Sequence, residues 1–178
     1  WDESYTPAQL NGLLEEYKGV SHEQLFDNLV YFLNGIMLAC DETGIDMAIH
    51  PDDPPWDMFG LPRIIVDENS YEKMFAAVPD KHNGITFCTG SLGAGRFNDL
   101  PAMAAKYARR IYFAHIRQLK YGDGKDFAEA GHLTEAGSLD IYAIVKSLVS
   151  SGFDGYVRPD HGRNIWGEDG KPGYGLYD

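Results

Sequence analysis

The sequence has few cysteines, a deficit of positive charge and no long hydrophobic run. Its 178 residues contain two cysteines, Cys40 and Cys88, which are too few for a disulfide framework and are expected to be reduced. There are 15 lysines and arginines against 27 aspartates and glutamates, and the net charge of -12 opposes binding to nucleic acid. The longest apolar runs, such as residues 29–40, fall short of the roughly 20 residues that span a bilayer. We therefore expect a cytoplasmic protein without nucleic-acid or membrane partners.

The composition is that of a globular domain. Hydrophobic residues make up 44% of the chain and aromatic residues 13%, which is ample for one buried core. No repeat, low-complexity tract or linker-like run divides the sequence, so residues 1–178 are interpreted as a single domain. The chain opens with WDESYTP, which has neither an initiator methionine nor the segments of a secretory signal, so we expect it to come from within a longer protein.

Helical and strand patterns alternate along the chain. A glycine stands between helix and strand in ETGIDMAIH and SSGFDGYVRPD, as is typical of a helix C-terminus. Alternation of this kind indicates an α/β protein with a parallel sheet, either an open doubly wound sheet or a (βα)8 barrel. Amphipathic helices are predicted at residues 22–42, 70–78, 99–108 and 140–151, and apolar strands at residues 45–50, 84–90, 110–117 and 155–162.

The residues at the strand ends favour the barrel. All four predicted strands end in a potential metal ligand, and in a barrel the carboxyl ends of different strands converge on one mouth. A complete barrel has eight strands and about 250 residues. We therefore predict that the chain is the C-terminal half of a (βα)8 TIM barrel, without the N-terminal strands and the final helix.

Four residues at these strand ends form a candidate metal site. His50, Cys88, His115 and Asp160 are separated by 38, 27 and 45 residues, and each interval holds one strand-to-strand crossover with its loops. Imidazole, thiolate and carboxylate together suit Mn(II), Fe(II), Co(II) or Zn(II), whereas Mg(II) and Ca(II) prefer oxygen ligands. A single histidine or cysteine near a strand end is more often packed or hydrogen-bonded than metal-bound, so the prediction rests on the four residues together.

Other residues of the same types are assigned to the fold instead of the site. His22 lies at a predicted helix start and His82 in a turn, so both are expected to be solvated. Cys40, on an apolar helix, is expected in the core. The glycine-rich residues 90–95 lack the ending and the spacing of a phosphate-binding loop, which argues against a nucleotide site.

Several motifs resemble those of the mannonate dehydratase family. The resemblance runs from about residue 22 to residue 178, in the family's order and with compatible spacing. It implies a xylose-isomerase-like barrel, Mn(II) or Fe(II) as cofactor, and the dehydration of D-mannonate to 2-keto-3-deoxy-D-gluconate in glucuronate catabolism. The motifs are HPDDPPW (50–56), GLPRI (60–64), FCTGSLG (87–93), NDLPAM (98–103), HIR (115–117), AGHL (130–133), RPDHGR (158–163) and PGYGLYD (172–178).

The resemblance also implies roles for individual residues. It carries over the same four metal ligands, and it assigns His161 and Tyr174 as the catalytic pair that transfers protons. Which of the two is the base stays open; a cation can lower the pKa of a nearby tyrosine, which favours Tyr174, and Tyr177 competes for that role. The expected partners are a small anionic sugar acid as substrate and a second copy of the chain in a homodimer.

Four residues are candidate substrate contacts. Arg117 belongs to the HIR motif, while Arg158 and Arg163 flank the Asp-His pair, where structural ion pairing is an equal alternative. His132 is either a surface loop residue or a substrate contact. Gln118 stands where the family more usually has asparagine, which affects one expected substrate hydrogen bond.

The proline-rich loop of residues 50–56 has two interpretations. It is either a rigid loop in which Asp52 and Asp53 are solvated, or a fixed rim that holds His50 and closes over the substrate, and the second is slightly favoured.

Two other functions fit the same residues. A metal-dependent sugar isomerase or epimerase on a similar barrel also needs a strand-end metal and a base. A non-catalytic metal-binding module would use the same ligands in a closed site without an exchangeable water. The RPDHGR and PGYG motifs favour the dehydratase, and a globular fragment without any metal is the simplest alternative.

Overall fold

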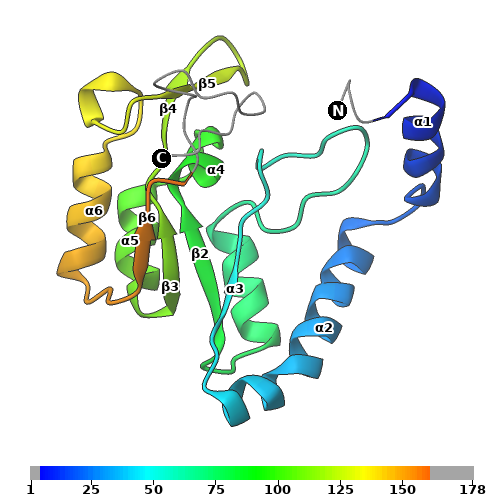
Figure 1. The fold of residues 1–178 in the computed structure, drawn as a ribbon, viewed down its shortest axis with the longest axis horizontal. Coiled ribbons are helices and arrows are strands. Elements are labelled where there is room, and N and C mark those ends of the chain that lie inside the picture. The colour runs from blue at the N-terminus through cyan, green and yellow to red at the C-terminus, as the bar shows by residue number, and fades with distance from the viewer. Residues whose placement is uncertain (1–4, 161–178) are drawn as a thin grey trace.

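The computed structural model describes residues 5–160. They form an α/β fold around a four-stranded parallel sheet in the order β1-β2-β3-β6 (Figure 1). The predicted parallel sheet is confirmed, although each strand is shorter than its apolar run. The strands are β1 (Met47–Ile49), β2 (Asn83–Cys88), β3 (Ile111–His115) and β6 (Tyr156–Arg158).

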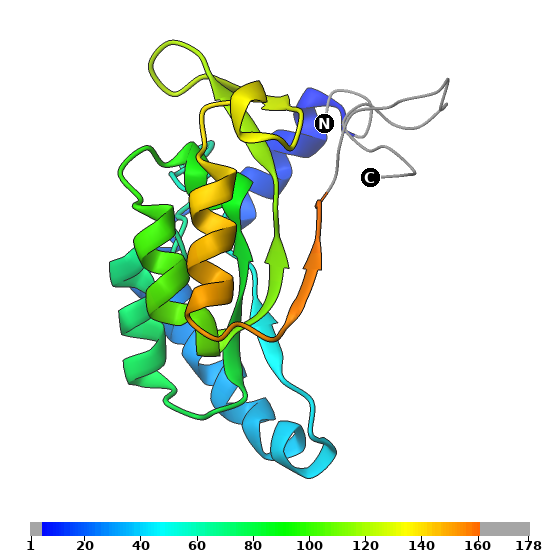
Figure 2. The same cartoon turned by 90° about the vertical axis from the view of Figure 1, so that its left-hand side faces the viewer.

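Helices cover one face of this sheet. Figure 2 shows α3, α5 and α6 side by side against it. Helix α1 lies apart from the sheet in Figure 1 and has no buried residue. Helices α2, α3, α5 and α6 confirm the four predicted helices, while α1 and α4 fall outside the prediction. The bounds are α1 (Pro7–Glu16), α2 (His22–Thr43), α3 (Glu68–Ala77), α4 (Thr89–Ala94), α5 (Leu100–Tyr107) and α6 (Ile141–Ser150), with short 3-10 turns η1 (Ala108–Arg110) and η2 (Thr134–Ala136).

The helix ends follow from local sequence. Ser21 accepts a hydrogen bond from the first-turn backbone of α2, and Asp67, Asp99 and Asp140 do the same for α3, α5 and α6. Helix α2 ends at Gly44, whose φ of 68° lies in the left-handed region that glycine adopts without steric cost. The glycine expected to stop this helix therefore does so.

The core lies between the sheet and its helices. Every residue of β2 is buried, and Tyr71 on α3 packs edge-on against Tyr107 of α5 with ring centroids 5.7 Å apart. Cys40 on α2 is buried, as predicted. Among the described residues, none of the helices combines the length and apolar content needed to cross a membrane.

An unpredicted β-hairpin follows β3. Strands β4 (Gln118–Tyr121) and β5 (Phe127–Ala130) pair in antiparallel fashion. Their connection contains Asp123 and Gly124, and Gly124 has a φ of 56°. Asp-Gly is a common dipeptide in hairpin turns, because the turn needs positive φ. The segment after His115 therefore leaves the main sheet and turns back above it.

The carboxyl ends of the parallel strands meet at one edge of the sheet. The register pairs Cys88 of β2 with His115 of β3, and His115 with Arg158 of β6. Beyond the ladder, Thr89 Oγ1 donates to the Arg117 carbonyl at 2.6 Å and accepts from the Arg117 N–H at 2.8 Å. Thr89 thus holds the ends of β2 and β3 together where the polar residues begin.

We expect Thr89→Val to destabilise the chain by about 1–3 kcal/mol, because it leaves buried backbone groups of Arg117 without a partner. Thr134→Val is the matched control, since that hydroxyl accepts from the exposed Tyr142 N–H and its loss should cost less than about 0.5 kcal/mol. Urea unfolding followed by circular dichroism measures both, and equal losses in the two variants would contradict the assigned role.

Candidate metal centre

Three of the predicted ligands come together at the carboxyl edge of the sheet. One donor atom each from His50, Cys88 and His115 lies within 4.8 Å of the other two. The Asp160 carboxylate lies 3.5 Å from Cys88 Sγ and 3.4 Å from His115 Nδ1. The four side chains therefore lie close together, although they come from separate segments of the chain.

Cys88 lies at the junction of β2 and α4. Its Sγ accepts hydrogen bonds from the Ser91 N–H at 3.4 Å and the Ser91 hydroxyl at 3.1 Å, so the cysteine caps the short helix. The pKa of the Cys88 thiol is raised to about 11, chiefly by burial and also by the Asp160 carboxylate, while the hydrogen bonds from Ser91 oppose the shift. The neutral thiol is favoured at this position, and a bound cation would favour the thiolate.

His50 is oriented by the chain that follows it. Its Nδ1 lies 2.7 Å from the carbonyl oxygen of Pro51. Because a carbonyl can only accept, Nδ1 is the donor, and in the neutral tautomer with this donor Nε2 has the lone pair. A backbone carbonyl in this position is a common partner of metal-binding histidines, since it fixes both tautomer and ring orientation. His50 is thus arranged to offer Nε2.

The loop after His50 is held in place by aspartates. Asp52 accepts from the backbone N–H groups of residues 64–65 at 2.8 and 2.9 Å. Asp53 forms an ion pair with Arg117. These bonds favour the interpretation of the loop as a fixed rim around His50, and they contradict the alternative in which both aspartates are merely solvated.

Asp160 adopts an unusual backbone conformation. Its φ of 80° lies in the left-handed region, which costs a residue other than glycine on the order of 1–3 kcal/mol. Such strain persists where surrounding structure imposes it, and it occurs often at functional sites. At Asp160 it accompanies a carboxylate placed against Cys88 and His115.

The donor set fits a divalent transition metal. A sulfur, two imidazole nitrogens and a carboxylate match the ligand preferences of borderline ions. The raised pKa of the Cys88 thiol adds to this fit, because a cation would compensate the thiolate charge in buried surroundings. The assignment of His50, Cys88, His115 and Asp160 as ligands of one ion stays a prediction.

Arg117 is a buried residue with carboxylate partners. Only 5% of it is exposed, its Nε donates to Glu129 Oε1 at 2.8 Å, and its two terminal nitrogens pair with Glu129 and Asp53. The structure gives this guanidinium partners within the protein, and contact with a substrate stays a prediction.

Gln118 is fully buried and supports the chain after the hairpin. Its Nε2 donates to the Leu139 carbonyl at 2.9 Å, and its Oε1 accepts from the Leu139 N–H at 3.0 Å. Gln118 therefore fixes the chain at Leu139 by bonding both of its backbone groups.

Two candidate substrate contacts are exposed near the same edge. Arg158 donates to the Asp160 carbonyl, and His132 Nε2 lies 3.3 Å from the Pro159 carbonyl. Both side chains thus contact the segment that carries Asp160. His161, Arg163, Tyr174 and Tyr177 lie outside the described residues.

The prediction that His82 is solvated is wrong. The residue is 8% exposed, its Nδ1 lies 2.7 Å from Asp46 Oδ1 and its Nε2 lies 3.5 Å from Asp41 Oδ1. It precedes β2 and so lies at the end of the sheet opposite the candidate ligands. His22 is solvated as predicted, with 60% of its side chain exposed beside Asp57.

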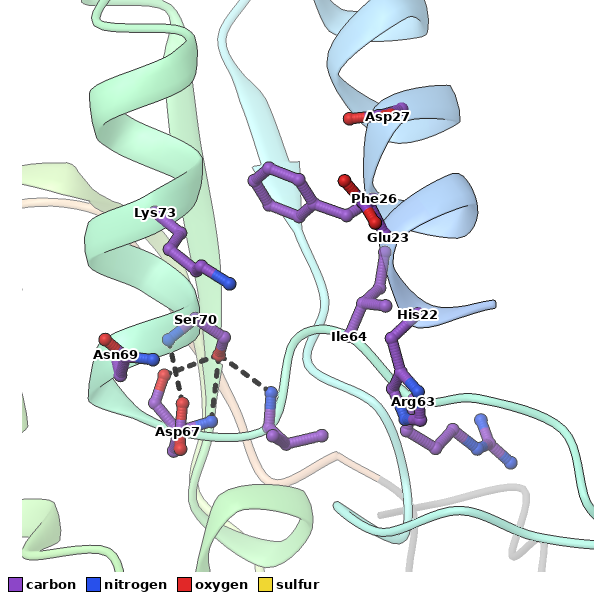
Figure 3. Close-up of a pocket in the computed structure, with 11 residues that line it drawn as sticks. His22, Glu23, Phe26, Asp27, Arg63, Ile64, Asp67, Asn69, Ser70 and Lys73 are labelled. Carbon is purple, nitrogen blue, oxygen red and sulfur yellow. Dashed lines mark hydrogen bonds between the residues drawn. The ribbon is translucent and has the colours of Figure 1, made fainter. Parts of the chain in front are cut away.

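A cavity of about 590 Å³ lies between the first turns of α2 and α3 (Figure 3). Charges of both signs line it, among them Glu23, Asp27, Arg63 and Lys73. None of the candidate ligands belongs to this lining; His50 instead borders a separate cavity of about 430 Å³. The larger cavity therefore lies apart from the candidate metal centre.

The whole chain, residues 1–178, matches the family described as D-mannonate dehydratase (UxuA). It is 51% identical over 180 residues to mannonate dehydratase 2 of Halalkalibacterium halodurans, and 49% identical over 178 residues to the mannonate dehydratase of Oceanobacillus iheyensis. These alignments cover 100% of this chain but only 52% and 51% of the relatives. The chain spans about half the length of the curated relatives it matches.

Two solved structures are similar to the chain. The mannonate dehydratase of Streptococcus suis serotype2 superposes with a TM-score of 0.86 at 44% identity, over 93% of this chain and 48% of that one. The IolI protein, solved with a bound zinc atom, superposes with a TM-score of 0.59 at 14% identity, over 79% of this chain and 48% of that one. The second likeness concerns the fold alone.

We expect Cys88→Ser to reduce metal affinity by more than the roughly 10- to 100-fold that outer-shell changes typically cost, because the substitution removes a predicted ligand itself. Cys40→Ser is the matched control, since that thiol is buried on α2 and has no place in the cluster. Metal content after dialysis, measured by elemental analysis, tests the pair. Full metal retention by Cys88→Ser would remove the thiolate from the ligand set.

Proposed function

The chain belongs to the D-mannonate dehydratase family, and we propose that it carries the metal site of a lyase that dehydrates D-mannonate to 2-keto-3-deoxy-D-gluconate in glucuronate catabolism. One observation supports this most directly. Imidazole, thiol and imidazole donors within 4.8 Å of one another, with a carboxylate beside two of them, lie at the carboxyl edge of a parallel sheet. That edge is where ligands bind in folds of this class.

We propose that the described sheet is the C-terminal half of a (βα)8 barrel. In the part of the chain that the structure describes, β1 and β6 each pair on one side only, so two edges are open to further strands. The relatives are about twice as long as this chain, and the half that it does not match is long enough to hold those further strands. On this view residues 1–178 form one part of a single barrel domain.

The proposed cofactor is Mn(II) or Fe(II), held by His50, Cys88, His115 and Asp160. When bound, such an ion would supply Lewis-acid stabilisation of negative charge, worth several kcal/mol, next to the substrate carboxylate. The mixed nitrogen, sulfur and oxygen donors support a transition metal over magnesium. Neutral sugar-acid hydroxyls and one carboxylate are the groups such a site would receive.

The dehydration needs two proton transfers by side chains. A base takes the proton from C2, and an acid protonates the C3 hydroxyl so that the C3–O bond breaks and water departs. The resulting enol then becomes the 2-keto acid by losing the proton of its C2 hydroxyl and gaining a proton at C3. We assign the first two transfers to His161 and Tyr174, with Tyr174 as the base, and each is typically worth about 10²- to 10⁴-fold in rate.

The remaining proposed contacts involve arginine and histidine side chains around the same edge. Arg158 and His132 are exposed beside the Asp160 segment, where they could meet an anionic substrate, and Arg163 is proposed to join them. Arg117 has protein carboxylates as partners, and its role is developed below. We further propose a cytoplasmic homodimer, in keeping with the free thiols of Cys40 and Cys88.

The direct test is an assay of the full-length protein on D-mannonate. Mn(II) is added after chelator treatment, and a 2-keto-3-deoxy acid is detected colorimetrically. We expect product with the metal and none without it. Conversion of D-mannonate to an isomer, with no loss of water, would replace the dehydratase by the isomerase or epimerase alternative.

Tyr174→Phe separates the proton transfer from metal binding. The variant should retain metal, because no tyrosine belongs to the proposed ligand set, yet lose exchange of the C2 proton with deuterated buffer by about 10²-fold or more. Tyr177→Phe is the matched control and should exchange at the unmodified rate. If Tyr177→Phe loses exchange and Tyr174→Phe keeps it, the assignment passes to Tyr177.

A further inference from the structure

We infer that Arg117 is a positioning residue that joins the loop carrying His50 to the β2–α4 junction carrying Cys88. The inference rests on the proposed metal centre. It concerns the Arg117 cluster, which we define as Arg117, Asp53 and Glu129. None of these three is a candidate metal ligand.

The guanidinium holds two distant segments. Asp53 lies in the loop three residues after His50, and Glu129 lies on β5 of the hairpin. Arg117 Nε donates to Glu129 at 2.8 Å, and its terminal nitrogens pair with Glu129 and Asp53. The planar guanidinium presents donors in a fixed fork, so it sets the separation and angle of its two partners more strictly than an ammonium would.

The stem and backbone of the same residue contact the segment after Cys88. Thr89 exchanges two hydrogen bonds with the Arg117 backbone. Gly90 packs so closely beneath the side chain that an added Cβ would lie 2.2 Å from Arg117 Cδ. Arg117 itself follows His115 by two residues. Arg117 therefore contacts the segment after Cys88 and the loop after His50, and it lies on the segment that follows His115.

The charges require one another. Only 6% of the Arg117 side chain is exposed, and a buried guanidinium needs carboxylate partners to offset the loss of hydration. Removing the arginine would leave Asp53 and Glu129 without their shared cation, and the loop that carries Asp53 would lose an anchor near His50. Loss of Arg117 should therefore weaken metal binding.

Direct binding of substrate is the competing role for Arg117. Three of the five guanidinium N–H groups already donate to protein carboxylates, and Asp53 and Glu129 already balance its charge, which favours the positioning role over substrate binding. The two roles predict different measurements. Positioning affects the affinity for metal, whereas substrate contact affects KM at saturating metal.

The experiment uses the full-length protein and Mn(II) alone as the probe. Arg117→Met and Asp53→Asn should each weaken Mn(II) binding about tenfold or more, measured by electron paramagnetic resonance of free Mn(II). The double variant should lose less than the product of the two single losses, because both act on one interaction. Arg117→Lys, which keeps the charge and loses the fork, should bind between wild type and Arg117→Met.

Arg96→Met is the matched control. Arg96 also donates to backbone around the hairpin, at the Gly122 carbonyl 2.7 Å away, but has no bond to the His50 loop among the described residues. Its Mn(II) affinity should equal that of wild type. If circular dichroism shows that Arg117→Met does not fold, the Mn(II) affinity of Asp53→Asn decides. That variant should fold, because 33% of the Asp53 side chain is exposed.

Two outcomes overturn the inference. A raised KM for D-mannonate with unchanged Mn(II) affinity assigns Arg117 to the substrate, and unchanged Mn(II) affinity with unchanged KM removes it from the site. Mn(II) binding needs no turnover. Wild-type protein that binds Mn(II) but does not dehydrate D-mannonate would therefore contradict the proposed function, while the Mn(II) measurements would still test the role of Arg117.

Discussion

The parallel register of β2 and β3 is the constraint on which the site depends. It pairs Cys88 with His115, and because parallel strands end at the same edge, their terminal side chains share one environment. A slip of one residue would turn one of the two toward the opposite face. Thr89 secures this register beyond the strands, through its hydrogen bonds to the backbone of Arg117. The apolar pattern of the strands does not predict these bonds.

Burial then sets the electrostatic requirements of the edge. It raises the pKa of the Cys88 thiol, and the Asp160 carboxylate beside it acts in the same direction. A cation is the simplest partner that relieves both effects, since it favours the thiolate and the carboxylate together. The buried guanidinium of Arg117 meets the complementary requirement a few residues away, where Asp53 and Glu129 supply the negative charge.

Local patterns were enough to predict the sheet, four helices and the grouping of the ligand candidates. Each rests on short-range features: apolar periodicity, a glycine such as Gly44 at a helix end, and a polar residue just after a strand. What failed depends on distant partners. His82 does lie in a turn, but its side chain is buried and pairs with the partly exposed Asp46, which lies 36 positions earlier in the chain. The Asp123-Gly124 dipeptide is the sequence signal that could have predicted the hairpin.

The same distinction explains why side-chain roles are harder to predict than side-chain positions. Arg117 follows the candidate ligand His115 by two residues, so its sequence position alone favours a part in binding. Its partners Asp53 and Glu129 lie 64 and 12 residues away, and only the fold shows that they accept hydrogen bonds from all three of its nitrogens. Asp160 adds a further case, because a left-handed backbone at an aspartate opposes local preference. Asp160 adopts this conformation where its carboxylate lies against Cys88 and His115, so its backbone reflects contacts within the assembled site that local sequence does not predict.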